Sequence, residues 1–295
     1  MGRLWGDGRR KSSANHLPAR PCVFRQPLGA DALFHGILMS RRGALPELRR
    51  FQARRRVKRS ARRNVRLMSI RVVGGGEPVV LVHGLAGSSG WWSRNLERLG
   101  GRFTLYIVDL PRRMFSLRQA HVWLAEAMGA AGLARAHVVG HSMGAAIALR
   151  LAADQPGLVD RLVLVAPAGL ATGRSFVGHA LPLAQALRRV SPYFLPLLVQ
   201  DAVRTGPVVL LRAARELLAG DVRGLLGAVS APALLVFGRR DMLVPPSLGE
   251  IFRAEMSDAR LVVIDDAGHV PMYEQPETFD RVVSQFLAQP SSVTS

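Results

Sequence analysis

The sequence predicts an α/β domain over residues 61–295, with a mostly parallel sheet covered by helices on both faces. From Val65 onward, short apolar runs alternate with longer segments of helical periodicity, which is the pattern of βαβ units. The runs are almost continuously apolar, as central strands buried on both faces are. With 48% hydrophobic residues, the chain is able to bury a core of this size.

Each element follows from its own pattern. Six apolar runs predict strands at 79–82, 103–108, 136–139, 161–165, 233–237 and 260–264. Segments of helical periodicity predict helices at 91–99, 117–131, 143–153, 248–255 and 276–288. Residues 168–229 interrupt this alternation, because they are rich in Leu, Ala and Arg and are cut into short pieces by four prolines. We expect them to form a helical cap over the carboxyl edge of the sheet, where open α/β sheets bind ligands.

The positive charge is concentrated at the N-terminus. Residues 1–66 hold 18 Lys+Arg against 3 Asp+Glu, whereas the remaining residues have a net charge of only +4. Residues 1–60 show no sustained periodicity and are expected to form a disordered, Arg-rich extension. A targeting segment, a functional tail and an over-called start codon all remain open for it. No apolar stretch follows its basic start, so no secretion signal is predicted and the expected location is cytoplasmic.

Several classes of protein are excluded by what the sequence lacks. No apolar run approaches the roughly 18 residues of a spanning helix, so no transmembrane segment is expected. Zinc-ligand clusters, P-loops and dinucleotide fingerprints are missing, so neither a metal nor a cofactor is expected. Aromatic residues are sparse among the N-terminal arginines, and no specific nucleic-acid binding is predicted. The single Cys22 has no partner for an internal disulfide.

The strongest motif is Gly140-His141-Ser142-Met143-Gly144, which follows a predicted strand and opens a predicted helix. This G-x-S-x-G context is typical of a nucleophile elbow, which exposes the serine hydroxyl at the helix N-terminus. We predict that Ser142 is a catalytic nucleophile with a strained backbone. Larger residues at 140 and 144 are expected to collide across the turn.

A glycine-rich loop after the strand at 79–82 predicts an oxyanion hole. Its donors would be the backbone N–H groups of Leu85, in that loop, and of Met143, the residue after the nucleophile. His83, at the end of the strand, is interpreted as a hydrogen-bonded structural residue.

Two later strands end in loops that carry the remaining candidates. His269 follows the strand at 260–264 and is predicted to be the general base. Asp241 follows the strand at 233–237 and is predicted to orient the imidazole. Asp265 and Asp266 are alternative candidates for the orienting acid only because they lie close to His269 in the sequence. Asp109 is interpreted as a structural hydrogen-bond partner.

With these motifs the chain resembles the α/β-hydrolase superfamily from about residue 65 to residue 288. The resemblance implies an eight-stranded, mostly parallel sheet with residues 168–229 as the cap. Many relatives carry Gly-x-Gly at the position where this chain has Arg112-Arg113-Met114. This difference affects the expected shape of the loop that follows, and not the predicted triad. Ser142 argues against the dehalogenase and epoxide-hydrolase branches, which use Asp at that position.

The expected function is hydrolysis of a small, uncharged acyl ester of short to medium chain length by a carboxylesterase-like serine hydrolase. Carbon–carbon bond hydrolysis stays open because Ala166-Pro167-Ala168-Gly169 looks like the corresponding turn of that branch. Many members of the branch carry Trp after the catalytic histidine, however, where this chain has Val270. Acyl transfer and a ligand receptor with an intact triad are further alternatives. The sequence leaves the oligomeric state open.

Overall fold

The computed structural model describes residues 69–111, 116–170, 178, 180–188 and 190–289. All of them belong to the unit formed by residues 57–295. The predicted extension at 1–60 and the divergent Arg112-Arg113-Met114 segment lie outside the described residues.

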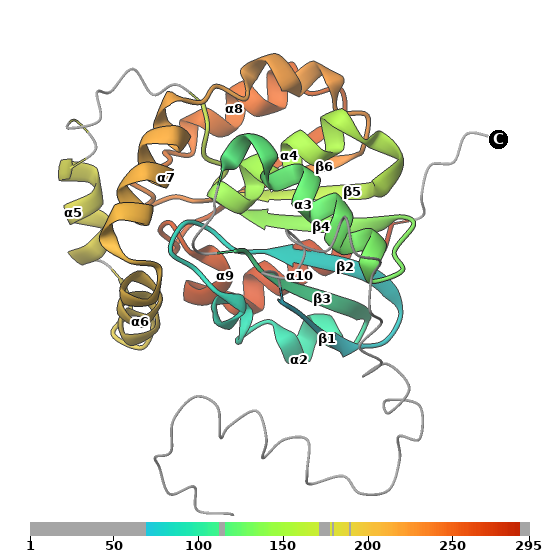
Figure 1. The fold of residues 1–295 in the computed structure, drawn as a ribbon, viewed down its shortest axis with the longest axis horizontal. Coiled ribbons are helices and arrows are strands. Elements are labelled where there is room, and N and C mark those ends of the chain that lie inside the picture. The colour runs from blue at the N-terminus through green and yellow to red at the C-terminus, as the bar shows by residue number, and fades with distance from the viewer. Residues whose placement is uncertain (1–68, 112–115, 171–177, 179, 189, 290–295) are drawn as a thin grey trace, which may run out of the picture. The chain divides into compact units, whose positions relative to one another are not determined.

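The fold is built on one mixed sheet (Figure 1). Its strands are β1 Ser69–Gly74, β2 Glu77–Val82, β3 Phe103–Asp109, β4 Ala136–His141, β5 Val159–Val165, β6 Ala233–Gly238 and β7 Ala259–Ile264. They are arranged in the order β1-β3-β2-β4-β5-β6-β7. Only the β1–β3 pair is antiparallel, so the predicted mostly parallel sheet is confirmed. The described residues contain seven strands, against the eight that the resemblance implies.

Helices pack on both faces of the sheet (Figure 1). They are α2 Leu96–Gly100, α3 Leu117–Ala130, α4 Met143–Asp154, α8 Ser247–Glu255, α9 Pro271–Glu274 and α10 Pro276–Leu287. The predicted helix at 91–99 is divided into the 3-10 helix Ser89–Trp92 and α2.

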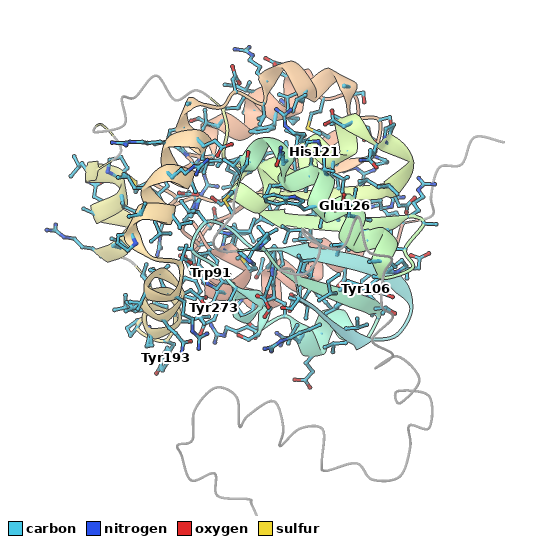
Figure 2. The ribbon with its side chains drawn as sticks, in the orientation of Figure 1. Trp91, Tyr106, His121, Glu126, Tyr193 and Tyr273 are labelled. Carbon is cyan, nitrogen blue, oxygen red and sulfur yellow. The ribbon has the colours of Figure 1, made fainter. Side chains whose placement is uncertain are left out.

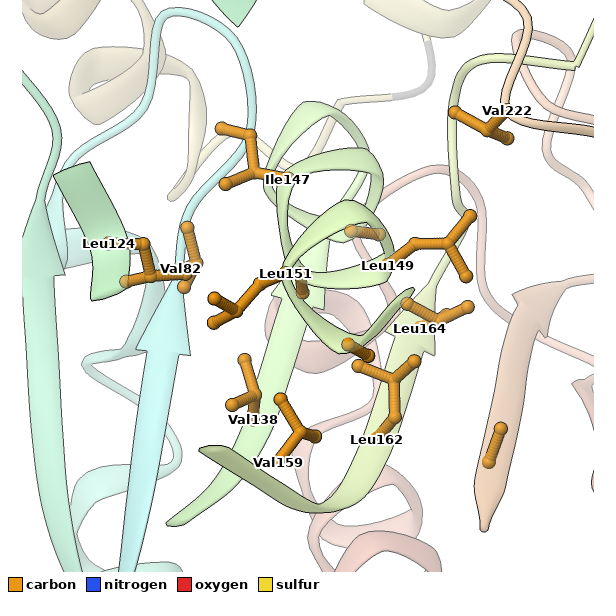
Figure 3. Close-up of a cluster of buried hydrophobic side chains, with 14 of the residues drawn as sticks. Val82, Leu124, Val138, Ile147, Leu149, Leu151, Val159, Leu162, Leu164 and Val222 are labelled. Carbon is orange, nitrogen blue, oxygen red and sulfur yellow. The ribbon is translucent and has the colours of Figure 1, made fainter. Parts of the chain in front are cut away.

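Alternate residues of each central strand point to opposite sides of the sheet. In β2, Val80 and Val82 join the core under α3, α4 and α8, and Val79 and Leu81 join the core that contains α2 and α10. Figure 3 shows part of the first core, where Val82, Val138 and Leu164 from three strands meet side chains of α4. Burial on both faces explains why the strands are apolar throughout.

Among the described residues, three α-helices lie between β5 and β6 in the sequence, within the predicted insertion, and Figure 1 shows them together at one end of the sheet. They are α5 Ala180–Arg188, α6 Leu195–Thr205 and α7 Pro207–Ala219. Pro196 and Pro207 lie in the first turns of α6 and α7. A backbone N–H in the first turn has no acceptor within the helix, so proline, which lacks this N–H, costs no hydrogen bond there. Gly206, with φ +83°, makes the break between α6 and α7.

The topology brings the predicted site residues to one edge of the sheet. Because β2, β4, β6 and β7 run parallel, the loops that follow them all leave from their carboxyl ends. These loops carry Leu85, Ser142, Asp241 and His269. No helix among the described residues is both long enough and apolar enough to cross a bilayer.

Candidate active site

Ser142 stands in a sharp turn between β4 and α4. Its backbone has φ 52° and ψ −111°, a conformation that residues with a side chain rarely adopt. A Cβ on Gly140 would overlap the main chain of Gly144, so the predicted collision across the turn holds at that position. A Cβ on Gly144 would instead meet the main-chain oxygens of Val82 and His83. At Gly144 the obstacle is therefore the end of β2, because α4 packs closely against that strand.

A continuous chain of hydrogen bonds joins the three residues predicted to form the triad. The Nε2 atom of His269 lies 3.1 Å from the Ser142 hydroxyl, and its Nδ1 atom lies 2.7 Å from Oδ2 of Asp241. The other carboxylate oxygen of Asp241 accepts the amides of Leu243 at 2.8 Å and Val244 at 3.0 Å. Asp241 is buried, and both of its oxygens are occupied, so its orientation toward the imidazole is held by the loop.

The electrostatic setting of His269 determines its tautomer. Burial lowers the pKa of His269, but the charge of Asp241 and its hydrogen bond raise it, and the net pKa lies above the ordinary value of 6.5. Since a carboxylate only accepts hydrogen bonds, the Nδ1–H of His269 must donate to Asp241. In the neutral imidazole, the Nε2 lone pair then faces the Ser142 hydroxyl and is able to accept its proton.

Two residues to which the sequence analysis gave no role of their own hold the loop of His269 in place. The Nε2–H of buried His141 donates to the main-chain oxygen of His269 at 2.8 Å. Burial, followed by the nearby charge of His269, keeps the pKa of His141 well below 6.5, so this imidazole stays neutral. The carboxylate of Glu274 accepts the amides of Gly268 and Val270 from the same loop.

The loop after β2 lies beside Ser142. A Cβ on Gly84 would come within 2.8 Å of Nδ1 of His141 and 3.3 Å of Cβ of Ser142, so a side chain here would force the buried His141 ring to shift. His83 accepts the Leu110 amide at Nε2 (3.1 Å) and donates through Nδ1 to the Gly84 oxygen (2.8 Å), which confirms its interpretation as a hydrogen-bonded structural residue. Within the described part of the chain, the amides of Leu85 and Met143 donate to no other main-chain group.

A buried carboxylate of α6 ties this loop to the helices between β5 and β6. Oδ2 of Asp201 accepts the Ser88 hydroxyl at 2.6 Å and the Trp91 indole N–H at 3.1 Å. Asp201 is completely buried, and the Trp91 ring packs on His141 and Phe194. Figure 2 shows Trp91 close to α6 at this junction. One signal was present in the sequence, because Asp201 is the only acidic residue between positions 161 and 215.

We expect Asp201→Ala to weaken both the fold and the site. The change leaves two buried donors, on Ser88 and Trp91, without their acceptor, at about 1–3 kcal/mol for each. Urea unfolding should show a loss of this size, and kcat/KM for a neutral ester should fall because the loop of Leu85 loses an anchor. Gln200→Ala, at an exposed position of the same helix, is the matched control. Equal stability of the two variants would contradict this role of Asp201.

The rival acidic residues take part in other contacts. Asp265 pairs with Arg239, and Asp266 pairs with Arg240 at 2.6 Å, with both carboxylates largely exposed. Asp109 accepts the Ser89 amide at 2.6 Å, which confirms its interpretation as a structural partner. Of the other histidines, His16, His35 and His179 lie outside the described residues. No group of three or more His, Cys, Asp or Glu in the described ranges is placed to hold a metal ion.

A cavity of about 1440 Å³ opens above Ser142 and His269. Most of its lining is apolar, and α5, α6 and α7 contribute part of it, including Leu187, Leu198 and Leu210. The charged groups at its wall are already engaged, since Arg240 pairs with Asp266 and Glu274 accepts two amides. The described cavity therefore suits an uncharged, largely apolar ligand.

Comparisons with known proteins agree with this architecture. A family model described as the alpha/beta hydrolase family matches residues 79–282. The pimeloyl-[acyl-carrier protein] methyl ester esterase of Nitrosomonas europaea is 32% identical over 71% of this chain and 95% of that protein. The 2-hydroxy-6-oxo-6-phenylhexa-2,4-dienoate hydrolase of Comamonas testosteroni is 28% identical over 73% of this chain and 89% of that protein. A hydrolase from Pseudomonas aeruginosa has the same fold, with a TM-score of 0.66 and 23% identity over 75% of this chain and 94% of that one.

Proposed function

Because the chain belongs to the alpha/beta hydrolase family, we propose that it is a serine hydrolase that cleaves small, uncharged carboxylic esters. The observation that carries the proposal is the hydrogen-bonded array from Asp241 through His269 to Ser142, which stands beneath an apolar cavity. This arrangement has the roles that acyl transfer requires, namely a nucleophile, a base and a group that orients the base.

In the proposed mechanism, Nε2 of His269 accepts the proton of the Ser142 hydroxyl while the oxygen attacks the ester carbonyl. The imidazolium that forms is stabilised by Asp241 and then protonates the leaving alkoxide, leaving an acyl group on Ser142. Water, deprotonated by His269, releases the acid and restores the serine. The 3.1 Å separation of Nε2 and the hydroxyl oxygen is within hydrogen-bond reach for the first proton transfer.

The amides of Leu85 and Met143 are the proposed oxyanion hole. Met143 is the first residue of α4, where an N–H has no acceptor within the helix, and Leu85 lines the cavity beside Ser142. Both amides lack a main-chain acceptor among the described residues, which leaves them available to a developing negative charge. Asp201 and Gly84 support the Leu85 loop by the contacts given above.

Labelling by a fluorophosphonate probe tests the proposal directly. The probe should label the wild-type chain at Ser142 and should not label Ser142→Ala, because only an activated serine attacks the phosphorus. Labelling of Ser142→Ala to the wild-type extent would overturn the assignment. Turnover of p-nitrophenyl esters separates an enzyme from a ligand receptor of the same fold, for which tight binding with one slow turnover is expected.

We propose that α5, α6 and α7 act as a cap that accommodates the acyl chain. Each buried methylene contributes about 0.8 kcal/mol until the cavity is full, so kcat/KM should rise with chain length and then fall. A cavity of about 1440 Å³ exceeds the roughly 300–1,000 Å³ of most ligand pockets, which favours medium over short chains. A series of p-nitrophenyl esters measures the profile. A flat profile, or activity limited to charged esters, would contradict this role of the cap.

Carbon–carbon bond hydrolysis is the second candidate, and the similarity to the Comamonas testosteroni enzyme favours it. The array of Ser142, His269 and Asp241 also fits that chemistry, whereas the mostly apolar cavity complements a neutral ester better than a dienoate, which carries a carboxylate. Turnover of a 2-hydroxy-6-oxodienoate, followed beside the ester panel, discriminates between the two reactions. A kcat/KM for the dienoate well above that for every ester would favour carbon–carbon cleavage.

A further inference from the structure

The outer side of the helices between β5 and β6 exposes an unusual amount of apolar surface. Ten of the thirteen large apolar side chains that are exposed among the described residues lie between positions 181 and 218. Four of them, Leu183, Leu187, Leu211 and Leu218, belong to the apolar lining of the cavity. The other six do not line the cavity and form what we call the outer face: Leu181, Tyr193, Leu195, Val199, Val203 and Val208.

The outer face follows the periodicity of α6. Leu195, Val199 and Val203 recur every four residues and form one stripe along the helix, with Val203 75% exposed. Inward positions of the helix hold Leu198, which lines the cavity, and buried Asp201. Valine is a poor helix former, so helix propensity does not account for two valines in a solvent-facing stripe. An exposed apolar stripe of this kind indicates a surface that contacts another protein or a membrane.

Tyr193, 83% exposed, extends the same face just before α6. Figure 2 shows it at the outer edge of the molecule, beyond α6. Tyrosine combines an apolar ring with a polar hydroxyl, and it is enriched at the interface between a bilayer and water.

The charges beside the outer face are positive. Residues 180–219 contain five arginines, and Arg188, Arg204 and Arg212 are exposed in the structure. Both carboxylates of the segment are engaged elsewhere, because Asp201 is buried against Ser88 and Trp91 and Glu216 accepts the Ser116 hydroxyl. Arginine side chains around an apolar surface complement anionic headgroups above an apolar layer.

We propose that the outer face binds the surface of a bilayer that contains anionic lipid, with α6 lying along the headgroup boundary. A second copy of the chain complements the face poorly, since a two-fold contact would bring the same arginines together. The net charge of +19 also favours an anionic surface. Binding in this orientation would bring the bilayer next to helices that line the apolar cavity, and it requires no catalytic activity.

Vesicle sedimentation with the full chain tests the proposal. The probes are vesicles of phosphatidylcholine alone and of phosphatidylcholine mixed with phosphatidylglycerol, at low salt and at about 0.5 M salt, where contacts between exposed charges are screened. The wild type should bind the mixed vesicles and keep part of this binding at high salt through its apolar contacts. Val199→Asp with Val203→Asp should lower the high-salt partition coefficient at least about tenfold.

Val72→Asp with Val122→Asp is the matched control, because it adds the same two charges at exposed valines of β1 and α3. Both double variants should keep the wild-type melting temperature, which serves as a test of folding that is independent of activity. Equal high-salt binding by the two double variants would overturn the proposal and attribute vesicle binding to another part of the chain, such as its basic N-terminus. Conversion of a wild-type dimer to a monomer by the α6 changes, seen by light scattering, would also overturn it.

Discussion

Replacing Ser142 by alanine is expected to remove nearly all ester turnover, by on the order of 10⁶-fold in kcat if the site behaves like other serine triads. Among the described residues, no other hydroxyl stands at hydrogen-bond distance from Nε2 of His269, so no other side chain is placed to replace the nucleophile. His269→Ala should be about as damaging, because the hydroxyl is a weak nucleophile without its base. Steady-state kinetics with a p-nitrophenyl ester measure both losses.

The double variant distinguishes a shared role from two separate roles. If Ser142 and His269 act as a unit, combining the two substitutions should lower kcat little further than either one alone. Circular dichroism melts show whether the variants keep their fold. Near-wild-type turnover by purified, folded Ser142→Ala would disprove the assignment of the nucleophile.

The second large effect is expected for Asp241→Asn, at roughly 10⁴-fold in kcat. The amide keeps the shape of the carboxylate, but it is able to donate a hydrogen bond to Nδ1 of His269 and so favour the wrong tautomer. It also removes the negative charge that raises the pKa of His269. Kinetics with the same ester give the change in kcat.

The pH profile provides a readout that loss of structure would not mimic. His269 must be neutral to accept a proton, so kcat/KM of the wild type should fall as the pH drops through its raised pKa, which lies above 6.5. In Asp241→Asn, burial still lowers the pKa while the opposing charge is gone, so this acidic limb should move to lower pH. An unchanged limb would show that Asp241 does not set the pKa of the base.

Asp265→Asn and Asp266→Asn are the controls for this prediction. Their carboxylates pair with Arg239 and Arg240 at the surface, where an ion pair contributes about 0–1 kcal/mol. Both changes should leave kcat within a few fold of the wild type. If either one were more damaging than Asp241→Asn, the choice of the acid would be wrong.

The sequence was most informative where one local pattern carries the whole feature. The apolar runs that became β2 to β6 are mostly buried, so each run is recognisable without its neighbours. β7 lies at the other edge of the sheet and is mostly half-buried, but its run is still apolar enough to be recognised. β1 was not among the predicted runs because it lies at the edge of the sheet and is largely exposed, with Val72 48% exposed. Such a strand depends on its partner β3 more than on its own residues.

The contacts that complete the candidate site are those that no local pattern encodes. His141 was recognised as part of the elbow, but its acceptor, the His269 oxygen, lies 128 positions further along the chain. The bond between Ser88 and Asp201 spans 113 positions. The packing of two distant segments decides which polar groups meet, so such contacts follow from the fold and are not readable from spacing.

The strained backbone at Ser142 affects which substitutions this chain tolerates at that position. With φ 52° and ψ −111°, position 142 suits glycine better than any residue with a side chain. A chain selected for thermal stability alone would therefore tend to lose the serine and with it the proposed chemistry. The proposed nucleophile thus occupies a place where stability and activity favour different residues, a conflict that stabilising substitutions elsewhere in the core are able to offset but not remove.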